Sequence, residues 1–210
     1  MKIIIPARRN SKGLPFKNRK LLNYTISSIP ENMKSSTYVS TDDEVIIEHL
    51  KDSGINTHHR SNHSARDQAS TKELICEFVD NLKADPEEII VMMYLTYPER
   101  TFDEVLQALE FFKDHNAKSL LCKKEVKSHP FLCLYEVGNH NGEQIVEHDL
   151  YRRQDYPKCF EISHYISIFK AKEVERLNKN LYNKDTIFYK IDDKIDVDLE
   201  QDLQRYEKND

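Results

Sequence analysis

The feature that most constrains the fold is an alternation of apolar runs with amphipathic segments, repeated about four times between residues 1 and 122. Apolar runs predict strands over 2–6, 37–40, 55–59, 89–94 and 119–122. Helical spacing of apolar residues predicts helices over 21–29, 42–54, 71–84 and 102–113. We expect Thr41 or Asp42 to cap the second of these helices. The alternation predicts an α/β fold with a Rossmann-like, mostly parallel sheet and helices on both faces.

The pattern changes between residues 123 and 157. A turn-forming stretch from Gly138 to Gly142 separates two segments that are typical of a hairpin. We interpret 123–157 as an arm for dimerisation, inserted into one α/β domain made of 1–122 and 158–210. After the arm, the pattern predicts extended segments over 160–169, 187–191 and 194–198 and helices over 170–177 and 199–206.

Composition excludes several classes of function. A net charge of −5 argues against nucleic acid as a general partner, because nucleic-acid-binding domains are usually basic. No stretch approaches the roughly 20 apolar residues of a membrane-spanning helix. The sequence shows no apolar signal region at its start, because the charged loop begins by Arg8, so we expect a cytoplasmic protein without a membrane partner. The four cysteines lack CxxC spacing and are expected to be reduced thiols rather than zinc ligands or disulfides.

A basic loop follows the first strand, where residues 7–18 read ARRNSKGLPFKN. In open α/β sheets, ligands bind where such loops leave the carboxyl ends of the strands. Cations and amides in this number favour a polyphosphate ligand. The loop contains neither GxxxxGK[ST] nor GxGxxG, which separates it from those two phosphate-binding motifs. A solvent-exposed basic loop has the same composition, so the loop alone leaves both interpretations open.

Two carboxylates lie near the other end of the chain, at Asp196 and Asp198. Side chains two apart on an extended segment share a face, and Ile195 and Val197 are then expected on the buried face. Paired carboxylates suit Mg²⁺, which takes one or two of them together with substrate phosphate oxygens. An exposed acidic strand face would give the same pattern. Basic loop and acid pair together predict a site for a nucleoside triphosphate and its metal.

Five segments, in order, resemble the acylneuraminate cytidylyltransferases, the CMP-sialic acid synthetase family. They are IPARRNSKGLPFKN at 5–18, VSTDDEVI at 39–46, Arg60 with DQAST at 67–71, YRRQDYP at 151–157 and IDVDLEQDL at 195–203. The resemblance implies the nucleotide-diphospho-sugar transferase type of fold. It also implies an enzyme that joins CMP from CTP to a 2-keto sugar acid, with Mg²⁺ as cofactor and pyrophosphate as product, in the synthesis of surface polysaccharide or glycan. A homodimer built through the arm is implied as well.

The resemblance also implies roles for individual residues. Catalytic roles fall on Arg8, Lys12, Lys17 and Asp198, with Lys12 stabilising the transition state and one carboxylate helping to take the proton from the sugar hydroxyl. Nucleotide contacts fall on Arg8, Ser11, Lys12, Lys17, Asn18, Arg60, Ser70 and Thr71. Metal ligation falls on Asp196 and Asp198. For the acceptor we expect Tyr94, Arg100, His164, Tyr165 and Arg152, the last reaching a neighbouring subunit's site.

The acceptor side departs from the family pattern. QPTSPLR is YLTYPER at residues 94–100, so Tyr94 replaces the glutamine that contacts the sugar. PNGxIY is ISHYIS at 162–167, and the PLxGKP turn after the first motif is missing. Changed polar contacts in a buried pocket strongly alter discrimination between substrates. A related nonulosonate is therefore as well supported as sialic acid, and the alternatives are CMP transfer to an alditol or sugar phosphate, or CTP binding without catalysis.

Overall fold

The alternating pattern builds one sheet, seen here in a computed structural model that describes residues 1–10, 13–61, 64, 66 and 68–208. The described part of this sheet contains β1 (Lys2–Pro6), β2 (Thr37–Thr41), β3 (Asn56–His59), β4 (Ile89–Met92), β5 (Ser119–Glu125), β8 (Phe160–Lys170) and β9 (Ile187–Lys190). Their order is β3-β2-β1-β4-β8-β5-β9. β8 runs antiparallel to both of its neighbours, β4 and β5, and the other neighbouring pairs are parallel. The predicted mostly parallel sheet is confirmed.

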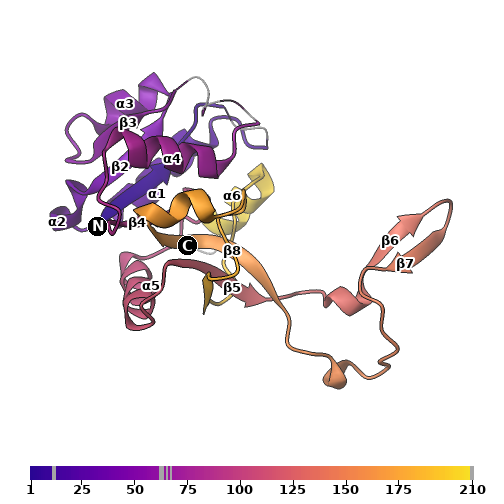
Figure 1. Cartoon of the computed structure of the whole chain (residues 1–210). Coiled ribbons are helices and arrows are strands. Elements are labelled where there is room, and N and C mark those ends of the chain that lie inside the picture. Colours follow the sequence, from indigo (N-terminus) through magenta and orange to yellow (C-terminus); the bar gives the residue numbers. More distant parts are fainter. Residues whose placement is uncertain (11–12, 62–63, 65, 67, 209–210) are drawn as a thin grey trace.

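Helices cover both faces of the sheet, as the sequence predicted (Figure 1). The helices are α1 (Lys17–Ser27), α2 (Glu31–Lys34), α3 (Glu44–Leu50), α4 (Thr71–Asn81), α5 (Phe102–Asp114) and α6 (Glu200–Glu207), with short 3₁₀ turns η1 (Pro130–Leu132), η2 (Arg153–Asp155) and η3 (Ala171–Arg176). Side chains alternate across β1, so Ile3 and Ile5 pack with α1, α3, α5 and α6. Ile4 points to the other face and packs with α4 and η3.

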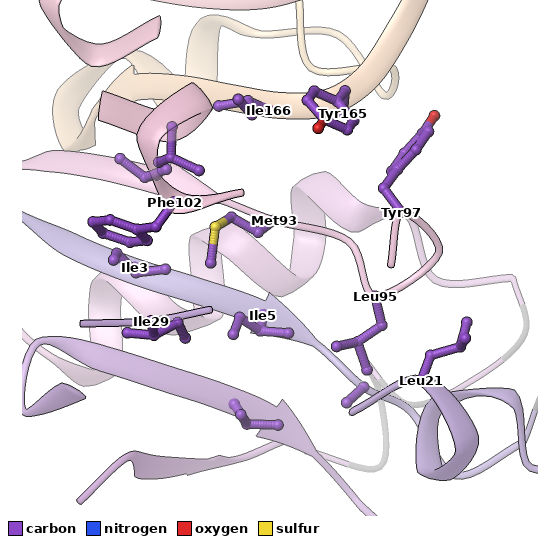
Figure 2. Packing of buried hydrophobic residues seen from close by; sticks show 14 of the residues in the cluster. Ile3, Ile5, Leu21, Ile29, Met93, Leu95, Tyr97, Phe102, Tyr165 and Ile166 are labelled. Carbon is purple, nitrogen blue, oxygen red and sulfur yellow. The ribbon is translucent and has the colours of Figure 1, made fainter. Parts of the chain in front are cut away.

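The larger core cluster ends close to the edge of the sheet where the parallel strands finish. Figure 2 shows Ile3 of β1 on one side of the drawn residues, Ile5 in the middle, and Tyr97 and Tyr165 on the other side. The rings of Tyr97 and Tyr165 meet edge to face, with centroids 5.2 Å apart. The core therefore extends to the loop that follows β4 and makes that loop a rigid support.

The arm projects away from the sheet and carries a two-stranded hairpin, β6 (Leu134–Val137) and β7 (Asn141–Gln144) (Figure 1). Aromatic packing at its base stacks Phe131 on His148, with ring centroids 4.2 Å apart, and sets Tyr156 against both rings. The predicted hairpin is present.

None of the described helices combines the length and the apolarity that crossing a lipid bilayer requires.

Some element predictions were wrong, for physical reasons. The segment 194–198 is extended but pairs with no described strand, because its N–H groups donate elsewhere: those of Ile195 and Val197 to the loop after β4 and that of Asp198 to Asp202 of α6. α1 begins at Lys17 rather than residue 21, since its first turn is polar and lies outside the apolar pattern. The cap of α3 is Asp43, whose side chain accepts from the N–H of Val45. The short helix predicted over 170–177 is present, as a 3₁₀ helix over 171–176.

Candidate active site

A cavity of about 400 Å³ opens at the carboxyl ends of the parallel strands, where the fold predicts a ligand site. It is lined from the β1–α1 segment, the β3–α4 segment, the loop after β4, strand β8 and the 191–199 segment. The lining residues are Pro6, Arg8, Lys17, Asn18, Arg60, Arg66, Ala69, Thr71, Leu74, Tyr94, Thr96, Tyr97, His164, Asp196 and Asp198. Residues at opposite ends of the chain thus share one site.

One side of the cavity is cationic and comes from Arg8, Lys17, Arg60 and Arg66. The loop that carries Arg8 is braced, because the Asn18 amide donates to the Arg8 carbonyl over 2.7 Å. The guanidinium of Arg60 donates to the Ser64 carbonyl, and its Nε is buried without a partner among the described residues. Burial lowers the pKa of Arg60, which is opposed by the charge of Asp42. This side suits an anion that supplies several acceptor oxygens.

The turn after β2 also supports the cationic loop. Asp42 accepts from the N–H of Arg9 over 2.7 Å, which ties the loop to β2. Asp43 caps α3 and receives two hydrogen bonds, 2.7 and 2.9 Å long, from Arg19 of α1. The VSTDDEVI segment is therefore a structural brace under the loop.

Gly13 brings the basic loop against the acidic segment. A Cβ added at Gly13 would lie 2.5 Å from the main-chain oxygen of Asp198. Real Cβ atoms essentially never come that close, so only glycine allows this packing. The contact explains how residues almost two hundred positions apart share a cavity.

Each of the two predicted metal-binding carboxylates has a defined partner. Lys17 Nζ lies 2.7 Å from Oδ1 of Asp198, and the Tyr97 hydroxyl donates to Oδ2 of Asp196 over 2.9 Å. Burial and the charge of Asp196 raise the pKa of Tyr97, so its hydroxyl remains protonated and able to donate. The carboxylate of Asp202 accepts from the main-chain N–H groups of Asp198 and Leu199, which fixes the turn that carries Asp198.

The donor set at these carboxylates fits a hard cation. The described residues hold no group of three or more His, Cys, Asp or Glu side chains arranged for a metal. Two carboxylates that face a cationic cavity match Mg²⁺, whose remaining ligands are usually water and substrate phosphate oxygens. The oxygen-only donors disfavour a zinc, copper or nickel site, whose ligands usually include imidazole or thiolate.

The cavity also has an aromatic wall, made of Tyr94, Tyr97 and His164. The rings of Tyr94 and His164 meet edge to face with centroids 5.9 Å apart. Both tyrosine hydroxyls are used within the protein, that of Tyr94 by Thr71 at 2.7 Å and that of Tyr97 by Asp196. His164 Nδ1 is buried and has no hydrogen-bond partner among the described residues. Burial lowers the pKa of His164, opposed by Asp196, so the ring is neutral at pH 7.

The structure brings most predicted site residues together but not all of them. Arg8, Lys17, Asn18, Arg60, Thr71, Tyr94, His164, Asp196 and Asp198 line the cavity, and Ser11 and Lys12 lie outside the described residues. Ser70 caps α4 by accepting from the N–H of Glu73. Arg152 lies on the exposed arm, paired with Asp155 at 2.7 Å.

Arg100 and Tyr165 do not line the cavity. Both side chains are buried, at 4% and 0% exposure. Arg100 donates to main-chain carbonyls, and the Tyr165 hydroxyl donates to Glu104 over 2.6 Å. An acceptor in this chain's own cavity therefore does not reach them directly.

Sequence reasoning did not single out Tyr97 and Arg66, which both line the cavity. Tyr97 follows the buried strand β4, so its place at the ligand-binding edge of the sheet was a usable signal. Arg66 lies in a polar loop without periodicity, and nothing in its local sequence separates it from other exposed arginines.

Comparison with known proteins identifies a family and several relatives. The model of a family described as cytidylyltransferase matches residues 2–207. A protein of Streptococcus agalactiae named N-acylneuraminate cytidylyltransferase is 28% identical over 95% of the chain, which spans about half (51%) of that relative's length. A Campylobacter coli protein named post-translational flagellin modification protein B is 26% identical over 95% of the chain and 89% of its own length.

Solved structures share the fold at low sequence identity. A CMP:2-keto-3-deoxy-manno-octonic acid synthetase in complex with CTP has a TM-score of 0.69 and 13% identity, with 99% of this chain and 97% of that chain covered. A 4-diphosphocytidyl-2C-methyl-D-erythritol synthase from Anaerococcus prevotii has a TM-score of 0.61 and 14% identity, with 99% and 96% covered. These likenesses concern the fold.

Proposed function

The chain belongs to the cytidylyltransferase family, and from this premise we propose that it transfers CMP from CTP to a 2-keto sugar acid and releases pyrophosphate. One observation carries the proposal: a single cavity joins a cationic side, two carboxylates and an aromatic wall. The names of the Streptococcus relative and of the octonic acid synthetase, whose structure contains CTP, support the same reaction. The aromatic wall differs from the family pattern, so the identity of the sugar acid is left to experiment.

The reaction forms one bond at phosphorus and breaks another. The acceptor hydroxyl attacks the α-phosphorus of CTP, the bond to the pyrophosphate oxygen breaks, and the hydroxyl proton leaves. Arg8 and Lys17, with Lys12 by resemblance, would balance negative charge on the phosphate oxygens. Asp198 would receive the proton. Asn18, Arg60 and Thr71 would bind the rest of the nucleotide, with Ser11 and Ser70 added by resemblance.

We propose Mg²⁺ as the cofactor, held by Asp196 and Asp198. When bound, it would shield the triphosphate charge and orient the leaving pyrophosphate. Lys17 would then exchange its contact with Asp198 for one with a phosphate oxygen, since its ammonium group lines the cavity in which the triphosphate would bind.

The aromatic wall is the proposed acceptor side. Its tyrosine hydroxyls already have partners, so His164 Nδ1 offers a hydrogen bond that no described residue satisfies. Leaving a buried polar atom without a hydrogen bond costs free energy. An oxygen of the sugar acid bound at this position would form that hydrogen bond and remove the cost.

We further propose a homodimer built through the arm. Many arm side chains are both apolar and exposed: Leu132, Leu134, Tyr135, Val137, Ile145, Val146, Leu150 and Tyr151. A lone two-stranded hairpin is marginally stable in water, and an exposed apolar surface of this kind marks a contact site. Arg152 on the same arm is the residue proposed to reach the partner's cavity.

Pyrophosphate release tests the reaction. The protein is incubated with Mg²⁺, each of the four nucleoside triphosphates, and a panel of 2-keto sugar acids, alditol phosphates and sugar phosphates. Release with CTP and a sugar acid is the expected result. Release only with a phosphorylated acceptor would favour the alternative transferase, and calorimetric CTP binding without release from any pair would contradict the assigned transfer.

A further inference from the structure

Arg100 is a buried cation outside the cavity. It ends the loop after β4, and its side chain is 4% exposed. Burial lowers its pKa to about 10, opposed by neighbouring groups that include Tyr165 and Tyr97, so it stays charged at neutral pH. Burying a charge is costly unless hydrogen bonds compensate for the lost water. The contacts of its guanidinium must therefore account for its presence there.

Those contacts are to main chain. Nη1 donates to the carbonyl of Tyr165 over 2.8 Å, and Nη2 donates to the carbonyl of Tyr94 over 2.7 Å. The guanidinium also lies 5.6 Å from the centre of the Tyr165 ring. No carboxylate of the described residues forms an ion pair with it. Arg100 thus joins β8 to the segment that follows β4.

The sheet needs this connection because its ladder is interrupted there. β4 and β8 pair as far as Met92 and Ser167, where β4 ends. On the other side of β8, Leu121 pairs with Ser167 while the next residue, Cys122, pairs with Ser163. Residues 164–166 are left out of that ladder as a bulge, a feature that often redirects side chains beside active sites.

The two carbonyls belong to the segments that form the aromatic wall. Tyr94 lines the cavity itself, and Tyr165 directly follows His164 in the bulge. We infer that Arg100 is a positioning residue, which holds Tyr94 and the 164–166 bulge so that the rings of Tyr94 and His164 face the acceptor. The inference rests on the proposed function for the acceptor side. It replaces the expected direct contact of Arg100 with the acceptor.

The test separates positioning from a general loss of stability. Arg100→Lys keeps the charge but lacks the planar fork that supplies two parallel donors. We expect its KM for the acceptor acid to rise about tenfold, while calorimetric CTP affinity changes by less than about twofold. Val174→Ala, in the core of the opposite sheet face, is the destabilised control and should leave both constants unchanged.

A second variant acts on the bulge without touching the buried charge. Ser163 Oγ accepts from the N–H of Tyr165 over 3.3 Å, so Ser163→Ala should raise the acceptor KM in the same direction by less. Changes of equal size in CTP affinity and in the KM for the acceptor acid would overturn the inference. An unchanged acceptor KM in both variants would overturn it as well.

Hydrogen exchange supplies a readout that needs no substrate. Arg100→Lys should speed amide exchange at 93–96 and 163–166 and leave α4 unchanged, whereas Val174→Ala should not single out those segments. If Arg100→Lys speeds amide exchange equally across the whole molecule, that result would count against a positioning role. Failure of the proposed function would show instead as absent turnover in the wild-type protein.

Discussion

At the scale of single residues, the cavity depends on side chains that hold one another. Tyr97 donates to Asp196, Lys17 pairs with Asp198, and Asn18 holds the carbonyl of Arg8. Preorganised groups of this kind act on charge that develops during reaction without first having to reorganise. Substitutions here should therefore change rates more than stability.

Asp198→Asn tests that expectation. The Asp198 side chain is 68% exposed, and exposed ion pairs contribute only about 0–1 kcal/mol to the free energy of unfolding. Losing a group that stabilises the reacting charges typically costs about a hundredfold or more in kcat. We expect pyrophosphate release to fall by that factor and its dependence on Mg²⁺ concentration to disappear. Glu200→Gln, which removes an exposed partner of Lys20 outside the cavity, should retain both rate and Mg²⁺ dependence; an active, Mg²⁺-dependent Asp198→Asn would contradict the role.

His58 predicts how stability depends on pH. Its ring is buried between Ser40 and Asn81, at 2.9 and 3.1 Å, and burial lowers its pKa, opposed by Glu77 and aided by Arg60 and His59. Below the ordinary histidine pKa of about 6.5, the unfolded chain binds a proton that the folded chain does not. The contribution of His58 to the free energy of unfolding should therefore be fully present above that pH and be lost as the pH drops below it.

The measurement is denaturant unfolding of wild type and His58→Gln at pH 7.5 and pH 5.5. Every other titrating group is common to both proteins, so the difference between their pH slopes reports His58. The variant should lose less stability on acidification than the wild type. Equal slopes would mean that the folded protein accepts the proton at His58 as readily as the unfolded chain.

At the scale of elements, caps and breaks in pairing determine where side chains point. α5 begins with a reciprocal capping box, in which Thr101 accepts from the N–H of Glu104 and Glu104 accepts from the N–H of Thr101. The same Glu104 receives the hydroxyl of Tyr165 and pairs with Lys194 at 2.8 Å. Partial burial opposes its ionisation, but these hydrogen bonds hold its pKa at about 2. The start of α5 is thereby tied to β8 through Tyr165 and to the 194–198 segment through Lys194.

Removing this cap should have a measurable effect on stability. Thr101→Ala should lower the free energy of unfolding by about 1 kcal/mol, because Thr101 Oγ1 satisfies the N–H of Glu104 at the start of the helix. Urea denaturation measures the change, and Thr101→Ser, which keeps the hydroxyl, is the matched control. A loss of equal size in both variants would show that the methyl group rather than the cap carries the effect.

What the sequence could predict at this scale followed from local pattern. The apolar runs of β1 and β4 and the periodicity of α4 and α5 are local, and those elements were predicted. The antiparallel direction of β8 and its bulge depend on partners distant in sequence, and no local pattern encodes them. The same holds for Arg100, whose residue type is mostly exposed and whose burial depends on two distant carbonyls. The segment 194–198 has a strand-like pattern but lacks a partner strand.

At the scale of the whole molecule, the body and the arm have opposite surface characters. The sheet buries its apolar residues between two layers of helices, whereas every residue of β6 and β7 is exposed. Figure 1 shows that the arm reaches well beyond the sheet. Such a segment gains stability when a second molecule covers it, and the homodimer proposed above would do so.

The proposed dimer can be tested by changing one face of the hairpin. Tyr135 and Val137 are two apart on β6 and share a face, so replacing both with serine removes apolar area without changing the backbone. Sedimentation velocity should give twice the mass of one chain for the wild type and the mass of one chain for this variant. Leu106→Ser, at an exposed leucine of α5 on the body, should remain dimeric. A wild-type protein that sediments as a single chain at all concentrations would refute the dimer.

If the arm also completes the partner's cavity, activity must be shared between chains. Arg152→Ala would lack the cation that the arm supplies to the other subunit, and Asp198→Asn would lack the carboxylate within its own cavity. Each variant alone should be nearly inactive. In a mixed dimer, however, the cavity of the Arg152→Ala chain keeps its own Asp198 and receives Arg152 from its partner, so that one site is whole.

The two variants can be unfolded, mixed and refolded together, so that exchange of chains produces mixed dimers. Mixing should therefore restore part of the wild-type pyrophosphate release. If Arg152 acted within its own chain, every cavity in every mixture would lack one of the two groups, and mixing would restore nothing.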